Sequence, residues 1–73
     1  MIPVEEAKAI LDRALSEEIG IALRVDSPKD FRQELLIAKR QLADPRYDVL
    51  VTLLPRGNEW VYICRKDAEG PLP

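Results

Sequence analysis

Residues 27–30, Ser-Pro-Lys-Asp, constrain the fold more than any other segment, because they mark the start of a helix. Serine suits the position before a helix, proline suits the first helical position, and an acid three residues after the serine completes a capping pattern. The helix ends at Asp44, because the residue before Pro45 is disfavoured in helical conformation. Its apolar positions recur at helical spacing and consist of Phe31, Leu35, Ala38 and Leu42.

Strand-like segments lie on both sides of this helix. Residues 21–26 alternate between large apolar and smaller or charged side chains, which is the period of a half-buried strand. Residues 47–54 and 59–66 have strand composition, and the Pro-Arg-Gly-Asn segment between them is typical of a hairpin turn. An amphipathic helix over residues 3–18 precedes the first strand, and Gly20 is placed to end it.

These elements predict one small α+β domain of order α-β-α-β-β over residues 1–66, with a disordered tail at 67–73. A helical crossover makes the strands it joins parallel in nearly all known cases, so we expect a three-stranded mixed sheet with both helices on one face. The last strand takes the outer edge beside the second strand, or lies between the first two as in split β-α-β folds. Either order leaves the other face of the sheet uncovered.

The chain has few ways to stabilise so small a core. A domain of 73 residues buries only about 60% of its unfolded surface. Small domains often add disulfides or a metal, but Cys64 is the only cysteine and histidine is absent. We therefore expect a homo-oligomer, in the form of a dimer. The lone thiol, the lack of a long apolar run and the lack of a secretory signal pattern predict a soluble cytoplasmic protein without membrane contact.

Catalytic chemistry has no support in the residue pattern. The commonest general acid/base is missing without histidine, and Cys64 is more typical of a small packed hydrophobe than of a nucleophile. The three glycines are scattered and form no phosphate-binding loop. We predict no enzyme activity, no catalytic residues, no cofactor and no metal site.

The uncovered sheet face is the first predicted interaction surface. If Val49, Val51 and Leu53 face the helices, the opposite face presents the alternate residues of each strand. Exposed apolar patches mark interaction sites, and Trp and Tyr are enriched among binding hot spots. We expect a protein interface made of Arg24, Leu50, Thr52, Trp60 and Tyr62. The alternative is that the tail or the first helix covers this face, or that a bulge reverses the register.

A second predicted surface is basic and lies on the helix that begins at Pro28. One flank of its apolar stripe carries Arg32, Lys39 and Arg40 around Leu36. Arginine and lysine around an apolar residue can dock an acidic partner or a phosphate backbone. The alternative is an ordinary solvated helix whose charges pair with one another.

Nucleic acid is the competing interpretation of the same residues. An open sheet with aromatic side chains can stack bases, and basic residues around it can hold phosphates; the candidates are Arg24, Arg56, Arg65 and Lys66. A net charge of -2 argues against this interpretation, as does the absence of the motifs of common nucleic-acid-binding modules. We therefore retain it as the alternative to protein binding.

Residues 20–66 resemble small phage- or prophage-encoded proteins of unassigned function. The resemblance lies in Gly-Ile-Ala-Leu-Arg-Val, in the helix that begins Ser-Pro-Lys-Asp-Phe-Arg, in Tyr-Asp-Val-Leu-Val and in Glu-Trp-Val-Tyr-Ile-Cys-Arg-Lys. It implies an accessory protein that binds a host, viral or defence component, and it assigns no functional residue. Together with the surfaces above, it predicts a non-enzymatic, self-associating protein-binding module.

Overall fold

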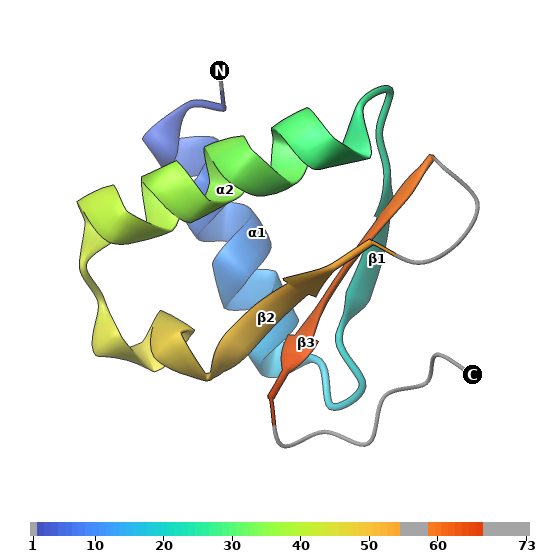
Figure 1. The fold of residues 1–73 in the computed structure, drawn as a ribbon. Coiled ribbons are helices and arrows are strands. Elements are labelled where there is room, and N and C mark those ends of the chain that lie inside the picture. The colour runs from blue at the N-terminus through green and yellow to red at the C-terminus, as the bar shows by residue number, and fades with distance from the viewer. Residues whose placement is uncertain (1, 55–58, 67–73) are drawn as a thin grey trace.

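The computed structural model describes residues 2–54 and 59–66, and its elements follow the predicted order (Figure 1). They are α1 Val4–Ser16, β1 Ile21–Arg24, α2 Pro28–Leu42, the 3-10 helix η1 Pro45–Val49, β2 Leu50–Leu53 and β3 Trp60–Arg65. The predicted α+β class is confirmed. The predicted hairpin turn at 55–58 and tail at 67–73 lie outside the described residues.

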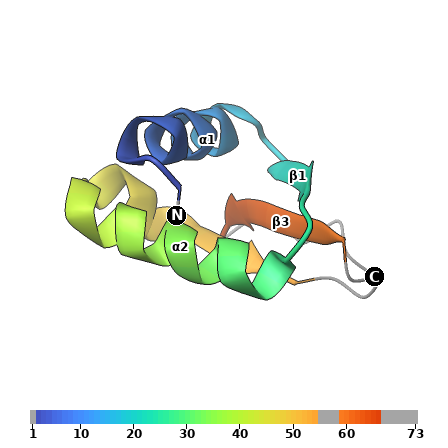
Figure 2. The same ribbon diagram turned by 90° about the horizontal axis from the view of Figure 1, so that it is seen from above.

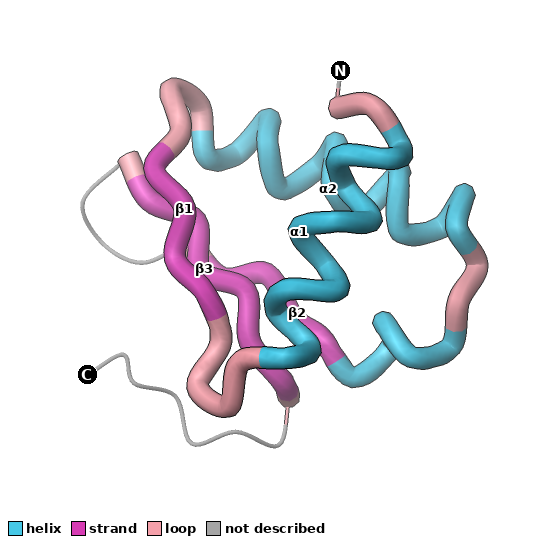
Figure 3. The backbone as a smooth tube through the Cα atoms, turned by 180° about the vertical axis from the view of Figure 1, so that it is seen from behind, coloured by secondary structure: helices cyan, strands magenta, loops and turns pink. Residues whose placement is uncertain are grey.

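The sheet has the order β1-β3-β2, and both of its pairings are antiparallel. The last strand in the sequence therefore lies in the middle, as in the split β-α-β alternative (Figure 3). The two strands joined by α2 run in the same direction but do not pair, because β3 separates them. The sheet is consequently antiparallel throughout and not mixed, and both β1 and β2 are edge strands.

Both helices pack on one face of this sheet and share one core with it (Figure 2). The buried residues of this core are Ala7, Leu11 and Ala14 of α1, Leu35 and Ala38 of α2, Ile21, Leu50, Val61 and Ile63 of the strands, and Tyr47 of η1. On β1 and β3 these side chains alternate with Arg24, Trp60 and Tyr62, which were predicted for the opposite face. The predicted apolar stripe of α2 also lies inward, with Phe31 and Leu42 partly buried at its ends.

The start of α2 follows the predicted capping pattern with one difference. Ser27 has extended backbone geometry and Pro28 is the first helical residue. The Ser27 hydroxyl donates to the Asp30 carboxylate at 2.9 Å and makes no bond to the backbone of the first turn. The helix ends at Leu42, where Ala43 adopts a left-handed conformation with φ of 50° and its N–H bonds to the Lys39 carbonyl.

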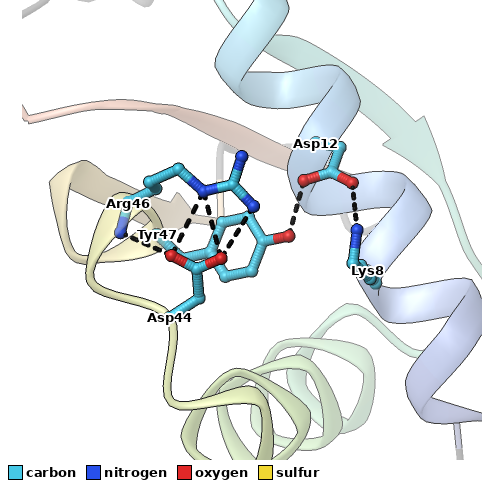
Figure 4. Close-up of polar contacts among 5 residues, drawn as sticks. All are labelled: Lys8, Asp12, Asp44, Arg46 and Tyr47. Atoms are coloured by element: carbon cyan, nitrogen blue, oxygen red, sulfur yellow. Dashed lines mark hydrogen bonds and ion pairs between the residues drawn. The ribbon is translucent and has the colours of Figure 1, made fainter.

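The segment after α2 is a 3-10 helix where the sequence predicted the start of a strand. Asp44 caps η1 by accepting from the backbone N–H of Arg46 at 3.0 Å, and its carboxylate also binds the Arg46 guanidinium. The Tyr47 side chain is completely buried, and its hydroxyl donates to Asp12 of α1 at 2.5 Å (Figure 4). Burial of this ring outweighs the strand propensity of the segment, so the strand begins only at Leu50.

This late start sets the side-chain alternation of β2. Leu50 is only 2% exposed and lies in the core, whereas Val49 is 46% exposed. Thr52 stands opposite Ile63, so it also lies on the helix side of the sheet. The prediction that Leu50 and Thr52 belong to the uncovered face is therefore wrong, and Val51 and Leu53 take that face instead.

Replacing the Tyr47 ring tests whether it holds η1 in place. We expect Tyr47→Ala to lower the free energy of unfolding by about 3 to 5 kcal/mol, because it removes a fully buried aromatic side chain. Tyr47→Phe keeps the ring and loses only the bond to Asp12, so it should cost less. Urea denaturation measures both changes, and an alanine variant as stable as the native chain would contradict this role.

The Asp12–Tyr47 bond also predicts how stability depends on pH. Hydrogen bonds from Tyr47 and Lys8 hold the pKa of Asp12 below its usual value. The stability that the Asp12 carboxylate contributes to the fold is therefore lost as pH falls through that lowered pKa. The bond to Asp12 and burial raise the pKa of Tyr47. The stability that the neutral Tyr47 hydroxyl contributes to the fold is therefore lost as pH rises through that raised pKa. Urea midpoints measured across the pH range should decline at both ends, and Tyr47→Phe should flatten both declines. Equal slopes in the two proteins would exclude this bond as the cause.

Candidate protein-binding surfaces

The sheet face opposite the helices is the first candidate surface and is called the open face below. Alternation along the paired strands places on it Ala22 and Arg24 of β1, Trp60, Tyr62 and Cys64 of β3, and Val51 and Leu53 of β2. Trp60 stands directly opposite Arg24, and Tyr62 lies between Ala22 and Leu53. Of the five residues predicted for this interface, the structure therefore brings together Arg24, Trp60 and Tyr62.

Exposed apolar side chains gather at one end of the open face. Trp60 is 44% exposed and Leu53 is 36% exposed. Leu53 pairs with Tyr62, and Trp60 lies two residues along the same side of β3, so the two exposed side chains are diagonal neighbours. Sequence reasoning found Trp60 but missed Leu53, because it assigned the β2 side chains to the wrong faces.

The other end of the open face is closed by the connection between α1 and β1. The Tyr62 hydroxyl donates to the carbonyl of Ile19, and Tyr62 and Cys64 are both buried. Gly20 has a φ of +91° and lies so close to Cys64 that an added Cβ would stand 2.7 Å from the Cys64 Cβ. Tyr62 is thus not the exposed contact residue that was predicted, and burial raises the pKa of both Tyr62 and Cys64.

Charges beside Trp60 are paired. Arg24 and Glu59 form an ion pair with an N–O distance of 2.8 Å, and both side chains are more than half exposed. Such a surface pair contributes little stability. The opposite charges of Arg24 and Glu59 cancel, so this pair adds no net charge to the exposed end of the open face.

A groove between α2 and the edge of β2 is the second candidate surface and is called the basic groove. Its volume is about 350 Å³, and it is lined by Arg32, Leu36 and Lys39 of α2, by Leu50, Val51, Thr52 and Leu53 of β2, and by Lys66. Three of the four residues predicted for a basic surface therefore meet here, whereas Arg40 is exposed on α2 outside the lining. Leu50 and Thr52, predicted for the open face, line this groove instead.

Lys39 connects the two walls of the basic groove. Its ammonium group donates to the carbonyl of Leu50 at 3.1 Å, across from α2 to β2. Burial lowers the pKa of Lys39, and the charge of Lys66 acts in the same direction, whereas Asp48 opposes them. The lysine therefore holds the helix against the strand and brings positive charge to the groove.

The structure offers little for cofactor or metal chemistry in the part that it describes. No group of three or more Cys, Asp or Glu side chains converges within residues 2–54 and 59–66. A second hollow of about 280 Å³ is mainly apolar and lies between the start of α1 and α2, where Ile37 is exposed. None of the described helices has the length and apolarity needed to cross a membrane.

Gly20 provides a test of how the connection closes over Cys64. We expect Gly20→Ala to lower the free energy of unfolding by more than about 1 kcal/mol, because its positive φ disfavours a side chain and the added Cβ would meet Cys64. Ile19→Ala is a matched control at an exposed neighbour, with an expected change within about 0.5 kcal/mol. Chemical denaturation measures both, and a neutral Gly20→Ala would show that the close approach is absent.

Comparison of the chain with protein-family models, with curated proteins and with solved structures gives no match.

Proposed function

We propose that this protein is a non-enzymatic protein-binding module that self-associates through its open face. One observation carries the proposal: Trp60 and Leu53 are large apolar side chains, exposed side by side on the sheet face that the helices do not cover. Trp is among the residue types that dominate binding energy when they are buried at an interface. A second copy would bury both side chains.

A second copy also fits the charges of this face. Arg24 and Glu59 neutralise one another beside Trp60, so two identical faces can meet without net repulsion from this pair. A two-fold contact buries the same patch on both subunits. It would also add buried apolar area to a chain of 73 residues, whose own core is small.

The geometry favours protein over nucleic acid as the ligand of the open face. Base stacking was predicted from Trp60 and Tyr62, but Tyr62 is buried and bonded to Ile19. Arg65, a candidate phosphate contact, donates to the carbonyl of Leu15 at 3.0 Å. The resemblance to phage proteins adds a host, viral or defence protein as a further partner of the module.

Solution mass tests self-association. We expect the native chain to approach a dimer as its concentration rises, and Trp60→Ser to remain monomeric, because loss of a hot-spot tryptophan weakens binding by about 30-fold or more. Ile37→Ser is the matched control, since Ile37 is similarly exposed at 38% but lies on α2. Sedimentation equilibrium measures the masses, with circular dichroism as the check on folding.

Two outcomes would reject this function. A native chain that stays monomeric at every concentration would exclude self-association. A dimer that persists in Trp60→Ser and dissociates in Ile37→Ser would move the contact from the open face to the outer surface of α2.

A further inference from the structure

The basic groove follows the outer edge of a strand. Four consecutive residues of β2, from Leu50 to Leu53, line it together with residues of α2. Successive side chains of a strand point to opposite faces, so a groove that reaches all four must run along the edge between those faces. Among the described residues this edge has no neighbouring strand, because β2 is the last strand in the order β1-β3-β2.

Hydrogen bonding along β2 shows which backbone groups point into the groove. The Lys66 N–H donates to the Val49 carbonyl at 2.7 Å, so Val49 bonds toward β3. Antiparallel pairing alternates, and therefore the backbone groups of Leu50 and Thr52 point outward. The Leu50 N–H donates to the Tyr47 carbonyl, and the Leu50 carbonyl accepts from the Lys39 ammonium group. Within the described residues, no such bond is found for the N–H and C=O of Thr52.

Side chains give this edge a distinct chemistry. Three basic residues, Arg32, Lys39 and Lys66, line the groove, and no acidic residue among residues 2–54 and 59–66 does. Asp48 is near enough for its charge to act on Lys39 but is not part of the lining. Leu36 and Leu53 are both 36% exposed and add apolar surface on either side of the strand edge.

We propose that the basic groove binds an extended acidic segment of another protein, which adds a fourth strand along β2. The backbone of the segment pairs with the N–H and C=O of Thr52, which gives main-chain affinity. Its carboxylates contact Arg32 and Lys66, and its apolar side chains pack on Leu36 and Leu53. The groove shares Leu53 with the open face but does not include Trp60, so a change at Trp60 tests the open face without altering the groove lining.

An acidic peptide fits this groove better than a nucleic acid does. Phosphates would use the three basic side chains but would leave the donor and acceptor of Thr52 without strand-like partners. A peptide satisfies both the charges and the backbone edge.

The direct test is a selection of random short peptides on the immobilised native protein. We expect enriched peptides to carry acidic residues at alternating positions without internal proline, because alternate side chains of an added strand face the same side. Synthetic copies of these peptides then serve as probes in fluorescence anisotropy. A single-stranded oligonucleotide is the comparison probe.

Two variants separate backbone pairing from charge. Thr52→Pro removes an N–H that points away from the sheet, a position where an edge strand tolerates proline. Arg32→Glu reverses a charge inside the groove, and Arg40→Glu makes the same change on the same helix outside its lining. We expect the first two to weaken peptide binding about tenfold or more and Arg40→Glu to change it little. Trp60→Ser should bind the peptide as the native chain does.

Several results would overturn the proposal. Selection that enriches no peptides, or only peptides without acids, would exclude an acidic segment. Peptide binding that is insensitive to Thr52→Pro would exclude strand addition. An oligonucleotide that binds more tightly than the peptides, and that Arg32→Glu weakens, would assign the groove to phosphates. If Thr52→Pro dissociated a native dimer, the edge would belong to a second copy. Circular dichroism and urea denaturation confirm that each variant folds.

Discussion

The burial of Tyr47 is the constraint on which the rest of the arrangement depends. Its ring lies in the core between the helices and the sheet, and its hydroxyl binds Asp12 on α1, which in turn binds Lys8 (Figure 4). The ring comes from a 3-10 helix that Asp44 caps, so the chain cannot enter the sheet before Leu50. One aromatic residue thereby fixes where β2 begins and which of its side chains face the core.

The position of β2 divides the exterior into two surfaces of different character. Leu53 joins Trp60 on the open face, where the nearby charges are paired and large apolar side chains are exposed. Thr52 turns its backbone away from β3, along a groove whose charged lining residues are all basic in the part of the chain that the structure describes. A face and a strand edge bind in different ways, the first by apolar burial and the second by main-chain pairing.

Local signals in the sequence predicted the parts of the fold that local interactions determine. The Ser27-Pro28 start of α2, its apolar stripe and the antiparallel pairing of β2 with β3 are confirmed. The strand order was left open, because periodicity reveals which side chains face a core but not which strands are neighbours. Tyr62 lies on the predicted face but is buried there, because its hydroxyl is covered by Ile19, far away in the sequence.

The faces of β2 were predicted the wrong way round because the short helix before this strand was not foreseen. Asp44-Pro45 was taken only as the end of α2, although a capping residue followed by proline is the same pattern that starts α2 at Ser27-Pro28. Used in the same way, it would have predicted a short helix before β2. The groove itself depends on how α2 lies against the strand edge, which no local pattern specifies.

Cross-strand contacts measured by NMR test this placement of β2 most directly. We expect a strong nuclear Overhauser effect between the Thr52 methyl and the Ile63 side chain, which stand opposite each other on the helix side of the sheet, and another between the Tyr47 ring and Asp12. Contacts of the Thr52 methyl with Tyr62 or Cys64 would place Thr52 on the open face. They would contradict both the role of Tyr47 and the division into two surfaces.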